Sequence, residues 1–387
     1  SRAIVSPTTR MNTTTAPTGT ASSTRLFNYP SLKKSIGRQA ALGQRGWSVR
    51  VHERSSELRA FGAGIFVWEN GLKVLGALGA HDPVLTGSWQ APQYEVRDHT
   101  NTLLAKQSFG LEIGTRMVTM TRQCLYQALL DAAAAAGAKF ETNSNVASAT
   151  SDGELVLGSG KRYSADLVIA ADVINAVVRE SLGLIRKRYQ AGNFGAIRLL
   201  VSRRSSEPDN VIHFLNSPDQ PIRRMLYVPC DKENLYVALT TEVGDIDART
   251  FPVNKELWAT TWPDMSDIFS RVTNNGRWDI YETIKLKSWS QGRVALIGDA
   301  AHGMAPTLGQ GAGCAMMNAL ALAVALEAAD GLEEGLRAWE RAERPLTEHT
   351  QNIAHRYMAK AHTGVGGGTL WDNDALRTAC HTPTGCG

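Results

Sequence analysis

Residues 298–313, GDAAHGMAPTLGQGAG, decide how this chain folds. They follow residues 293–297, RVALI, an apolar run of the kind that forms a buried strand of a parallel sheet. Asp299 therefore lies at the carboxyl end of a strand, where open α/β sheets bind their ligands. A glycine-rich turn then opens a long apolar helix, predicted over residues 311–329. This stretch predicts an α/β fold with a ligand at one edge of its sheet.

The glycine-rich turn suits a cofactor that approaches the backbone closely. Glycine has no Cβ, so a ligand can reach the backbone N–H groups, and the amino end of the following helix favours negative charge. An acid, a glycine turn and a helix start together suit a cofactor with a hydroxylated chain and an electron-accepting ring. His302 lies in the same block, where two interpretations stay open: a helix-start packing residue or a catalytic group.

Two further segments are predicted to be strands of the same sheet. Residues 46–53, GWSVRVHE, form a turn and a short strand that ends in Glu53. In a nucleotide-binding βαβ unit such an acid binds ribose hydroxyls. Residues 165–172, ADLVIAAD, form a buried strand that ends in Asp172. Thr121 is the predicted N-cap of a helix.

Composition and charge exclude several classes of protein. Of the 387 residues, 43% are hydrophobic and 20% charged, so a sizeable core is expected and wholesale disorder is excluded. No run of about 18 apolar residues is present, so no membrane span is expected. The net charge of +4 is too balanced for a nucleic-acid binder. The five widely spaced cysteines indicate neither a disulfide framework nor a metal site, and they favour a reducing, cytoplasmic location.

The motifs resemble those of the single-component FAD-dependent aromatic hydroxylases, the p-hydroxybenzoate hydroxylase family. Residues 298–313 are similar to the family's flavin-contacting motif, and residues 53–65 to its ribose-binding acid and flavin-side loop. Residues 166–179 resemble its second fingerprint. Within the family, 2-methyl-3-hydroxypyridine-5-carboxylate oxygenase and 5-pyridoxate oxygenase share similar runs, which are SSELRAFGAGI (55–65), RMLYVPC (224–230) and QGAGCAM (310–316).

The resemblance implies a Rossmann-like FAD-binding domain with an inserted β-rich substrate domain and C-terminal helices. The FAD-binding domain would comprise residues 39–88, 108–185 and 284–345. Residues 89–107 and 186–283 would form the substrate domain. Beyond the region of resemblance, residues 346–387 are expected to form a C-terminal helix and a loose tail, because the segment from Gly364 is rich in glycine.

The resemblance also assigns site residues by matching position. Those that bind the cofactor would be Glu53, Arg54, Arg59, Arg122, Asp172, Asp299, Gly309, Gly311, Ala312 and Gly313. Those that bind the substrate would be Tyr94, Arg198, Arg224, Tyr236 and Tyr281, with Arg224, Tyr236 and Pro306 as catalytic residues. An arginine fork pairs with a carboxylate in bidentate fashion, and a tyrosine can orient a ring hydroxyl. The alternative for each tyrosine is a strand residue that packs in the β domain.

The implied activity is that of an FAD-dependent monooxygenase. NADH or NADPH would reduce FAD, and dioxygen would then oxygenate a hydroxylated aromatic or pyridine carboxylate, with ring opening left undecided. The sequence does not distinguish NADH from NADPH, and it leaves the oligomeric state open, a homo-oligomer included. A flavin halogenase or reductase of the same fold is a further alternative, although the halogenase segment Trp-x-Trp-x-Ile-Pro is missing.

The first 38 residues match nothing in the family. The glycine turn that holds the FAD pyrophosphate is expected near residues 28–35, but NYPSLKKS stands there, without a glycine and with the rigid Pro30. Val173 also replaces the family's glycine after Asp172. A defective flavoprotein that no longer holds FAD is therefore the alternative function. A misread exon or decay of a gene copy would each produce this pattern.

The composition of residues 1–25 carries two further expectations. This segment is rich in Ser and Thr and lacks acidic residues, so disorder is expected. The same composition resembles an organelle transit peptide, which leaves targeting open beside a plain extension.

Overall fold

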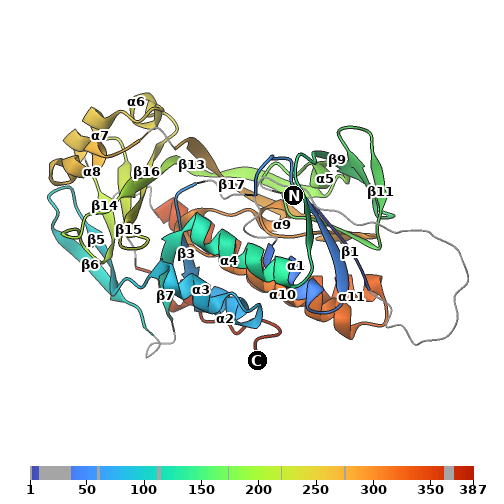
Figure 1. Cartoon of the computed structure of the whole chain (residues 1–387). Coiled ribbons are helices and arrows are strands. Elements are labelled where there is room, and N and C mark those ends of the chain that lie inside the picture. Colours follow the sequence, from blue (N-terminus) through green and yellow to red (C-terminus); the bar gives the residue numbers. More distant parts are fainter. Residues whose placement is uncertain are drawn as a thin grey trace, which may run out of the picture.

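The chain folds into two lobes that lie side by side (Figure 1). The structure is a computed structural model, and it describes residues 2–7, 36–58, 62–110, 115–172, 174–218, 220–273, 276–360 and 370–387. One lobe, the α/β lobe, combines a mixed sheet with long helices, and the other, the β lobe, is built on a largely antiparallel sheet. The predicted fold class, a Rossmann-like lobe with an inserted β-rich lobe, is confirmed.

A six-stranded sheet organises the α/β lobe. β12 pairs in parallel with β19, and β2 pairs in parallel with β8. β1 lies between the two pairs and is antiparallel to both β12 and β2, so these two strands run in the same direction. The carboxyl ends of β19, β12, β2 and β8 therefore meet at one edge of the sheet. Glu53, Asp172 and Asp299 follow β2, β12 and β19 at this edge. In spatial order the strands are β18 (Ser290–Gln291), β19 (Val294–Leu296), β12 (Leu167–Ala170), β1 (Arg2–Pro7), β2 (Trp47–His52) and β8 (Lys139–Glu141).

The central strand β1 runs antiparallel to both of its neighbours. Arg2 pairs with His52 and Ala170 at the carboxyl edge, and Pro7 pairs with Trp47 at the opposite edge. In a nucleotide-binding βαβ unit this strand runs parallel to its neighbours and ends in the glycine turn. In this chain β1 ends at the opposite edge of the sheet, so a glycine turn directly after it would not lie beside Glu53, Asp172 and Asp299.

The expectation of disorder over residues 1–25 is therefore wrong for Arg2–Pro7. Two neighbouring strands, β12 and β2, leave backbone N–H and C=O groups that need partners, and a strand of either direction can pair with them. Residues 8–35, which include the segment NYPSLKKS, lie outside the described residues.

Helices α1, α4 and α10 pack together beside this sheet (Figure 1). Thr121 caps α4 as predicted, because its hydroxyl accepts a hydrogen bond from the Cys124 backbone N–H at 3.2 Å. Among the described helices α10 alone has the length and hydropathy to cross a membrane, but 67% of that window is buried, as in a core helix. The helices of this lobe are α1 (Ile36–Gly43), α2 (Glu69–Ala77), α3 (His81–Thr86), α4 (Arg122–Ala135), α5 (Val177–Ser181), α9 (Asp299–His302), η4 (Pro306–Leu308), α10 (Gly311–Ala328) and α11 (Leu332–Lys360).

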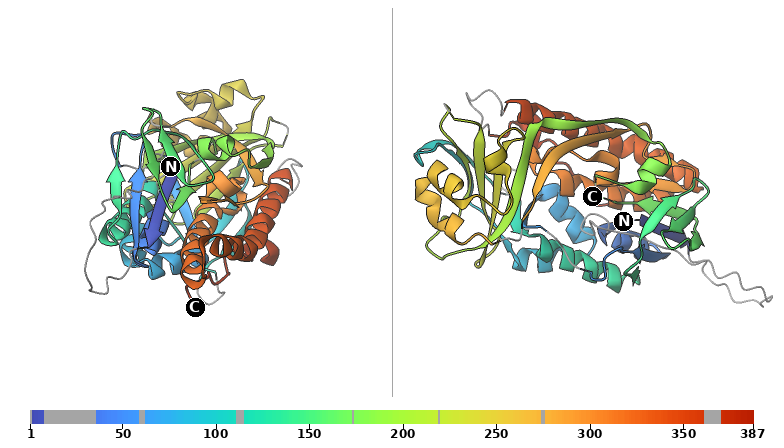
Figure 2. Two further views of the ribbon diagram at one scale, coloured as in Figure 1. Left: turned by 90° about the vertical axis from the view of Figure 1, so that its right-hand side faces the viewer. Right: turned by 90° about the horizontal axis from the view of Figure 1, so that it is seen from above.

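A seven-stranded sheet forms the β lobe, and two long strands join it to the α/β lobe (Figure 2). In spatial order the strands are β17 (Trp278–Leu286), β13 (Ile185–Ser202), β16 (Asn234–Glu242), β15 (Arg223–Pro229), β14 (Val211–Leu215), β5 (Gln93–Arg97) and β6 (Leu103–Ser108). Its short helices are α6 (Ile246–Arg249), α7 (Lys255–Thr261), η3 (Pro263–Met265) and α8 (Ser266–Ser270). They cover one face of the sheet, where Trp258 and Trp262 are buried in its core.

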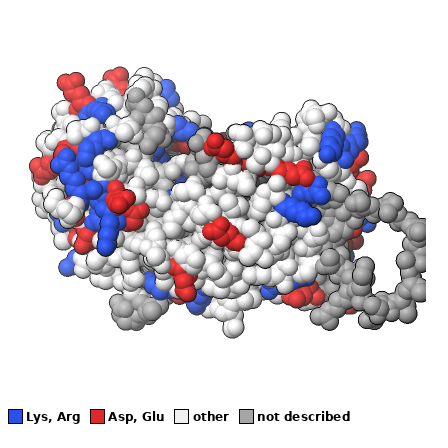
Figure 3. Space-filling view, viewed as in Figure 1, with Lys and Arg blue, Asp and Glu red and all other residues white. Residues whose placement is uncertain are grey.

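Two small sheets complete the fold. One consists of β11 (Arg162–Ser164), β10 (Glu154–Leu157) and β9 (Val146–Ala149), the other of β3 (Gly64–Trp68), β7 (Met117–Thr121) and β4 (Ser88–Trp89). On the face drawn in Figure 3, Lys and Arg gather near the end of the β lobe beside acidic side chains. Elsewhere on that face the two signs of charge are interspersed.

The end of the chain is packed rather than loose. Helix α11 continues through the predicted domain boundary at residues 345 and 346. Residues 361–369 lie outside the described part of the chain, and the short helix α12 (Asn373–Leu376) follows them. Ala375, Thr378 and Ala379 are at least 97% buried, because small side chains allow this segment to lie close against α11 and α2. The expectation of a loose tail is thus wrong from residue 370 onward.

Candidate active site

A cavity of about 310 Å³ lies between the two lobes. The β lobe contributes one face of its seven-stranded sheet, and the α/β lobe contributes the loop before α10 and the start of that helix. Five predicted substrate residues line it together with Pro306, namely Tyr94, Arg198, Arg224, Tyr236 and Tyr281. Predicted cofactor residues line the same space, namely Arg122, Asp299, Gly309, Gly311 and Ala312. The structure thus brings together residues from seven separate segments of the chain.

Strand alternation explains why polar side chains reach the cavity. Tyr236 and Thr240 lie on the cavity face of β16, while Leu235, Val237 and Leu239 point to the opposite core with the tryptophans of α7 and its neighbours. The pairing of β15 with β16 then sets Arg224 opposite Thr240. A one-residue shift in register would move these side chains into the core, so the register fixes the site.

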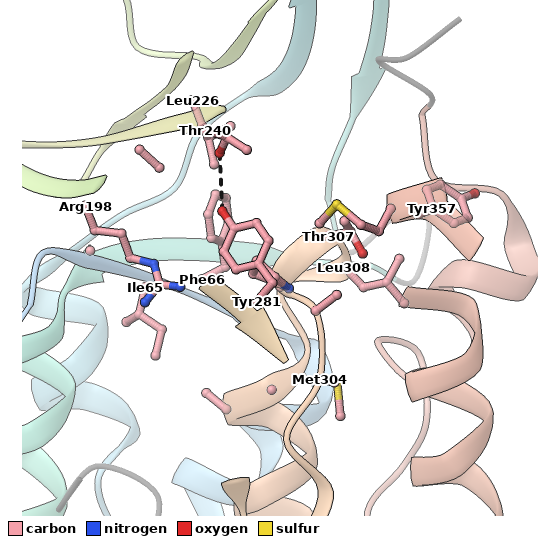
Figure 4. Close-up of a pocket in the computed structure, with 18 of the residues that line it drawn as sticks. Ile65, Phe66, Arg198, Leu226, Thr240, Tyr281, Met304, Thr307, Leu308 and Tyr357 are labelled. Carbon is pink, nitrogen blue, oxygen red and sulfur yellow. Dashed lines mark hydrogen bonds between the residues drawn. The ribbon is translucent and has the colours of Figure 1, made fainter. Parts of the chain in front are cut away.

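Tyr281 and Arg198 form one polar group in the cavity (Figure 4). The hydroxyls of Tyr281 and Thr240 are 3.2 Å apart, within hydrogen-bond distance. The guanidinium of Arg198 lies 5.8 Å from the centre of the Tyr281 ring, and Nη1 of Arg198 lies 3.6 Å from a carboxylate oxygen of Asp279. Asp279 therefore balances much of the charge of Arg198.

Tyr94 and His213 form a second polar group, beside Arg224. A hydrogen bond of 3.0 Å joins Oη of Tyr94 to Nδ1 of His213. Burial, and to a lesser extent the charge of Arg224, lowers the pKa of His213 to about 3, so the imidazole is neutral at pH 7. Burial raises the pKa of Tyr94 above its ordinary value, so the phenol keeps its proton.

His213 and Thr240 also line the cavity, and neither was predicted from the sequence. Both lie on strands whose alternation could have placed them on the same face as Arg224, because β14 pairs with β15 and β15 with β16. The necessary signal was the strand order, which a single sequence does not contain. Histidine and threonine are common in β-rich lobes, so neither residue type by itself predicted a place in the cavity.

The loop before α10 contains two glycines in an unusual backbone conformation. Gly298 and Gly309 both have positive φ, 59° and 62°, a conformation that side chains with a Cβ rarely adopt. The indole N–H of Trp68 donates to the Leu308 carbonyl at 3.1 Å and holds the loop from behind. Gly313 does not line the cavity, but a Cβ there would lie 2.9 Å from Gln310 Oε1. The amino end of α10 lines the cavity, and the partial positive charge of a helix start suits a flavin ring that carries partial negative charge.

The remaining predicted cofactor residues lie away from this cavity. Glu53 is 98% buried, and its Oε2 has no hydrogen-bond partner among the described residues. A carboxylate oxygen at the carboxyl edge of the sheet, without a partner among these residues, is suited to accept a hydrogen bond from a ribose hydroxyl. Asp172 is buried at the end of β12, Arg54 is exposed to solvent, and Arg59 lies outside the described residues.

Two other members of the predicted motifs have structural roles. Arg179, fully buried, donates from Nη1 to the Ala300 carbonyl at 3.0 Å and so links the second fingerprint to the flavin motif. His302 is 99% buried, with Nε2 3.0 Å from Asn318 Nδ2 and its ring 5.5 Å from that of Trp289. These contacts favour the packing interpretation of His302 over the catalytic one.

Replacing Gly64 by alanine is expected to lower turnover by about 10-fold. A Cβ at this position would lie 2.5 Å from Cβ of Tyr236 and 2.7 Å from its ring, so the tyrosine must move. Overpacking of this kind costs about 1–3 kcal/mol, and the displaced ring lines the cavity. The control is Gly76→Ala in α2, where a Cβ meets no atom within 4 Å. Equal turnover of both variants and the unmodified protein would show that the position of Tyr236 is unimportant.

Replacing Glu53 by glutamine is expected to stabilise the FAD-free protein at pH 8 by about 1 kcal/mol, and to weaken FAD binding about 10-fold. Burial raises the pKa of the Glu53 carboxyl above its ordinary value, despite an opposing hydrogen bond from the Ser55 N–H. A raised folded-state pKa means that stability is lost as the pH rises from about 4.5 through that pKa.

Denaturant unfolding of the FAD-free protein at pH 5 and pH 8 measures this effect, and flavin fluorescence titration gives the affinity. Glu57→Gln, an exposed carboxylate on the same loop, is the matched control. A glutamine variant that is less stable than the unmodified protein at pH 8 would contradict the assignment of Glu53 as an unsatisfied buried acid.

Comparison with known proteins gives a consistent result. Residues 39–350 match the family described as FAD binding domain. A putative 2-heptyl-3-hydroxy-4(1H)-quinolone synthase of Rhodococcus erythropolis is 37% identical over 361 residues, 89% of this chain and 93% of that protein. 6-hydroxynicotinate 3-monooxygenase of Pseudomonas fluorescens is 29% identical over 81% of this chain and 85% of its own length. The structure of 2-methyl-3-hydroxypyridine-5-carboxylic acid oxygenase is 39% identical, with a TM-score of 0.85 over 92% of this chain and 95% of that one.

Proposed function

Because the chain belongs to the FAD binding domain family and is an FAD-dependent monooxygenase, we propose that it oxygenates a hydroxylated pyridine or benzene carboxylate. NADH or NADPH is the proposed reductant and dioxygen the proposed oxidant. One observation carries the substrate class. Arg224, 92% buried, lines the cavity together with the flavin motif and with the neutral Tyr94–His213 pair.

FAD supplies the redox chemistry of this family, the acceptance of a hydride and the activation of dioxygen. Asp299 and the amino end of α10 are the residues that would hold its ribityl chain and its ring. They fit the cofactor because Gly309, with positive φ, and the helix start at Gly311 leave backbone N–H groups and open space at the cavity. Glu53 would bind the ribose through its unsatisfied oxygen.

The substrate residues have distinct proposed roles. The guanidinium of Arg224 would pair with the substrate carboxylate through two parallel hydrogen bonds. Tyr236 and Tyr281 would orient the ring hydroxyl, since both hydroxyl-bearing rings line the cavity. Pro306 belongs to the loop that positions the ring against the flavin site. Apolar neighbours such as Phe66 and Leu226 exclude water from the reacting atoms.

The quinolone-related and pyridine-related similarities point to different ring systems. The quinolone synthase is named for a product with a bicyclic ring and an alkyl chain, whereas the pyridine oxygenase is named for a carboxylate. We favour the carboxylate, because the guanidinium of Arg224 lines the cavity and can form hydrogen bonds to a carboxylate but not to an alkyl chain.

The test is oxygen uptake and reductant oxidation by the purified, FAD-loaded protein. A 3-hydroxypyridine-5-carboxylate is expected to stimulate both. The product should be heavier by one oxygen atom, with water released, if the ring is hydroxylated, and by two oxygen and two hydrogen atoms if the ring is opened. Mass spectrometry of that product shows whether the ring has opened. If only benzoates stimulate the reaction, the pyridine assignment is wrong, and if no carboxylate does, the proposed substrate class is wrong.

A second candidate function is that of a flavoprotein that does not retain its FAD. The specific observation behind it is the reversed β1, whose carboxyl end lies at the edge opposite Glu53. The visible absorbance of the purified protein distinguishes the candidates. A colourless protein that takes up no flavin after FAD is added would support the second and overturn the first.

The proposed partners are a small aromatic substrate and dioxygen, with no nucleic acid or membrane. We propose a reducing, cytoplasmic location, since none of the five cysteines forms a disulfide bond.

A further inference from the structure

Trp371 forms part of the cavity wall, although it lies near the end of the chain. Its ring centre is 4.6 Å from that of Tyr94, and the two planes are tilted by 44°. It also lies 5.2 Å from the ring of Trp68 and 6.1 Å from that of Phe109. The indole N–H donates to the Thr307 carbonyl at 3.0 Å, in the turn that contains Pro306. One side chain thus contacts the substrate strand and the loop before the flavin site.

The backbone around Trp371 is held at several points. The side-chain amide of Gln107 on β6 donates to the Trp371 carbonyl at 3.0 Å and accepts from its N–H at 3.1 Å. The hydroxyl of Tyr357 on α11 accepts a hydrogen bond from the Asp372 N–H at 3.0 Å. Asp372 in turn caps α12, and Asp374 forms an ion pair with Arg356 at 2.6 Å. The backbone at this position is therefore held to β6 and α11, and the indole is held to the Thr307 carbonyl.

The cavity has little spare room. Its volume of about 310 Å³ is near the lower end of the range for ligand pockets, roughly 300–1,000 Å³. The same space is lined by Asp299, Gly309 and Gly311, so the flavin ring would occupy part of it. What remains beside Tyr94 and Arg224 is bounded by the Trp371 indole.

We infer that Trp371 is a specificity-determining residue, which restricts this enzyme to substrates with a single aromatic ring. The inference rests on the proposed function, since it concerns the same cavity. In a substrate held by Arg224, a second fused ring on the side of Tyr94 would meet the indole. Loss of the indole leaves space for that second ring, and it also removes the hydrogen bond to the Thr307 carbonyl.

The test compares Trp371→Ala with Trp371→Phe in the FAD-loaded protein. Calorimetric titration measures the dissociation constants of a 3-hydroxypyridine carboxylate and of the corresponding 3-hydroxyquinoline carboxylate. Reductant oxidation in the presence of each compound gives KM and kcat. The unmodified protein is expected to prefer the pyridine by about 100-fold. The alanine variant should reduce this preference by about 10-fold or more, mainly by tighter quinoline binding, whereas phenylalanine should retain most of it.

The possible results separate this inference from the proposed function. A protein that binds neither compound overturns both. A protein that binds the pyridine carboxylate, but whose alanine variant keeps the original preference, overturns only the inference. Equal loss of affinity for both compounds would show that the indole is merely structural, which also overturns it. If the alanine variant does not fold, Trp371→Leu is judged by the same ratio of dissociation constants.

Discussion

Replacing residues 1–35 with a parallel strand that ends in a G-x-G-x-x-G turn before α1 is expected to tighten FAD binding by about 100-fold or more. The turn would present backbone N–H groups to the pyrophosphate at the carboxyl edge of the sheet, close to the start of α1. Hydrogen bonds to charged groups contribute about 1.5–3 kcal/mol each. Two of them account for a factor of about 100. Fluorescence titration of FAD with both proteins measures the change.

The direction of β1 is the structural reason for this expectation. Arg2 lies at the carboxyl edge and Pro7 at the opposite edge, so this strand does not lead directly into α1 at the cofactor site. The replacement makes the central strand parallel to its neighbours and supplies the three glycines of the turn.

The matched control for this experiment carries the same new strand with all three glycines changed to valine. It should fold as well but bind FAD no more tightly than the original chain. If the original chain is purified with one FAD per molecule, and the replacement leaves the affinity unchanged, the glycine turn is dispensable here.

The elements with strong local signals were predictable from the sequence. The helix 311–329 is observed as Gly311–Ala328, and the N-cap of α4 is Thr121, because the signals that begin a helix act within a few residues. The acids after β2, β12 and β19 also lie at one edge, since parallel strands align their carboxyl ends.

Features that depend on distant contacts were not predictable. Arg2–Pro7 has no strand signal of its own and is a strand because two neighbours provide hydrogen-bond partners. Trp371 lies beyond a glycine-rich segment and was assigned to a loose tail, yet Gln107, 264 residues earlier, holds its backbone. His213 reaches the cavity through the strand order, which places β14 between β5 and β15. Each case needs the tertiary structure, because the partners are far apart in the chain.

Replacing Arg224 by alanine is expected to raise KM for a hydroxypyridine carboxylate by about 100-fold or more. The side chain is 92% buried and lines the cavity, so its hydrogen bonds to a substrate carboxylate would form away from bulk water. Truncating one member of a buried charge pair costs about 2–5 kcal/mol, much of it from the unpaired partner. Arg224→Lys should raise KM less than Arg224→Ala but still above that of the unmodified protein, because an ammonium group lacks the planar N–H donors that pair with a carboxylate in bidentate fashion.

The carboxylate itself provides the decisive control. With a 3-hydroxypyridine that lacks the carboxylate, the unmodified protein and Arg224→Ala should have similar KM values, since the lost contact has no partner on the substrate. Arg204→Ala, an exposed arginine that pairs with Asp267 elsewhere in the β lobe, should change neither value. If Arg224→Ala weakens both substrates equally, the arginine supports the cavity structurally and the anion is bound elsewhere. In that case Arg198 is the residue to test next, because it lines the same cavity beside Tyr281.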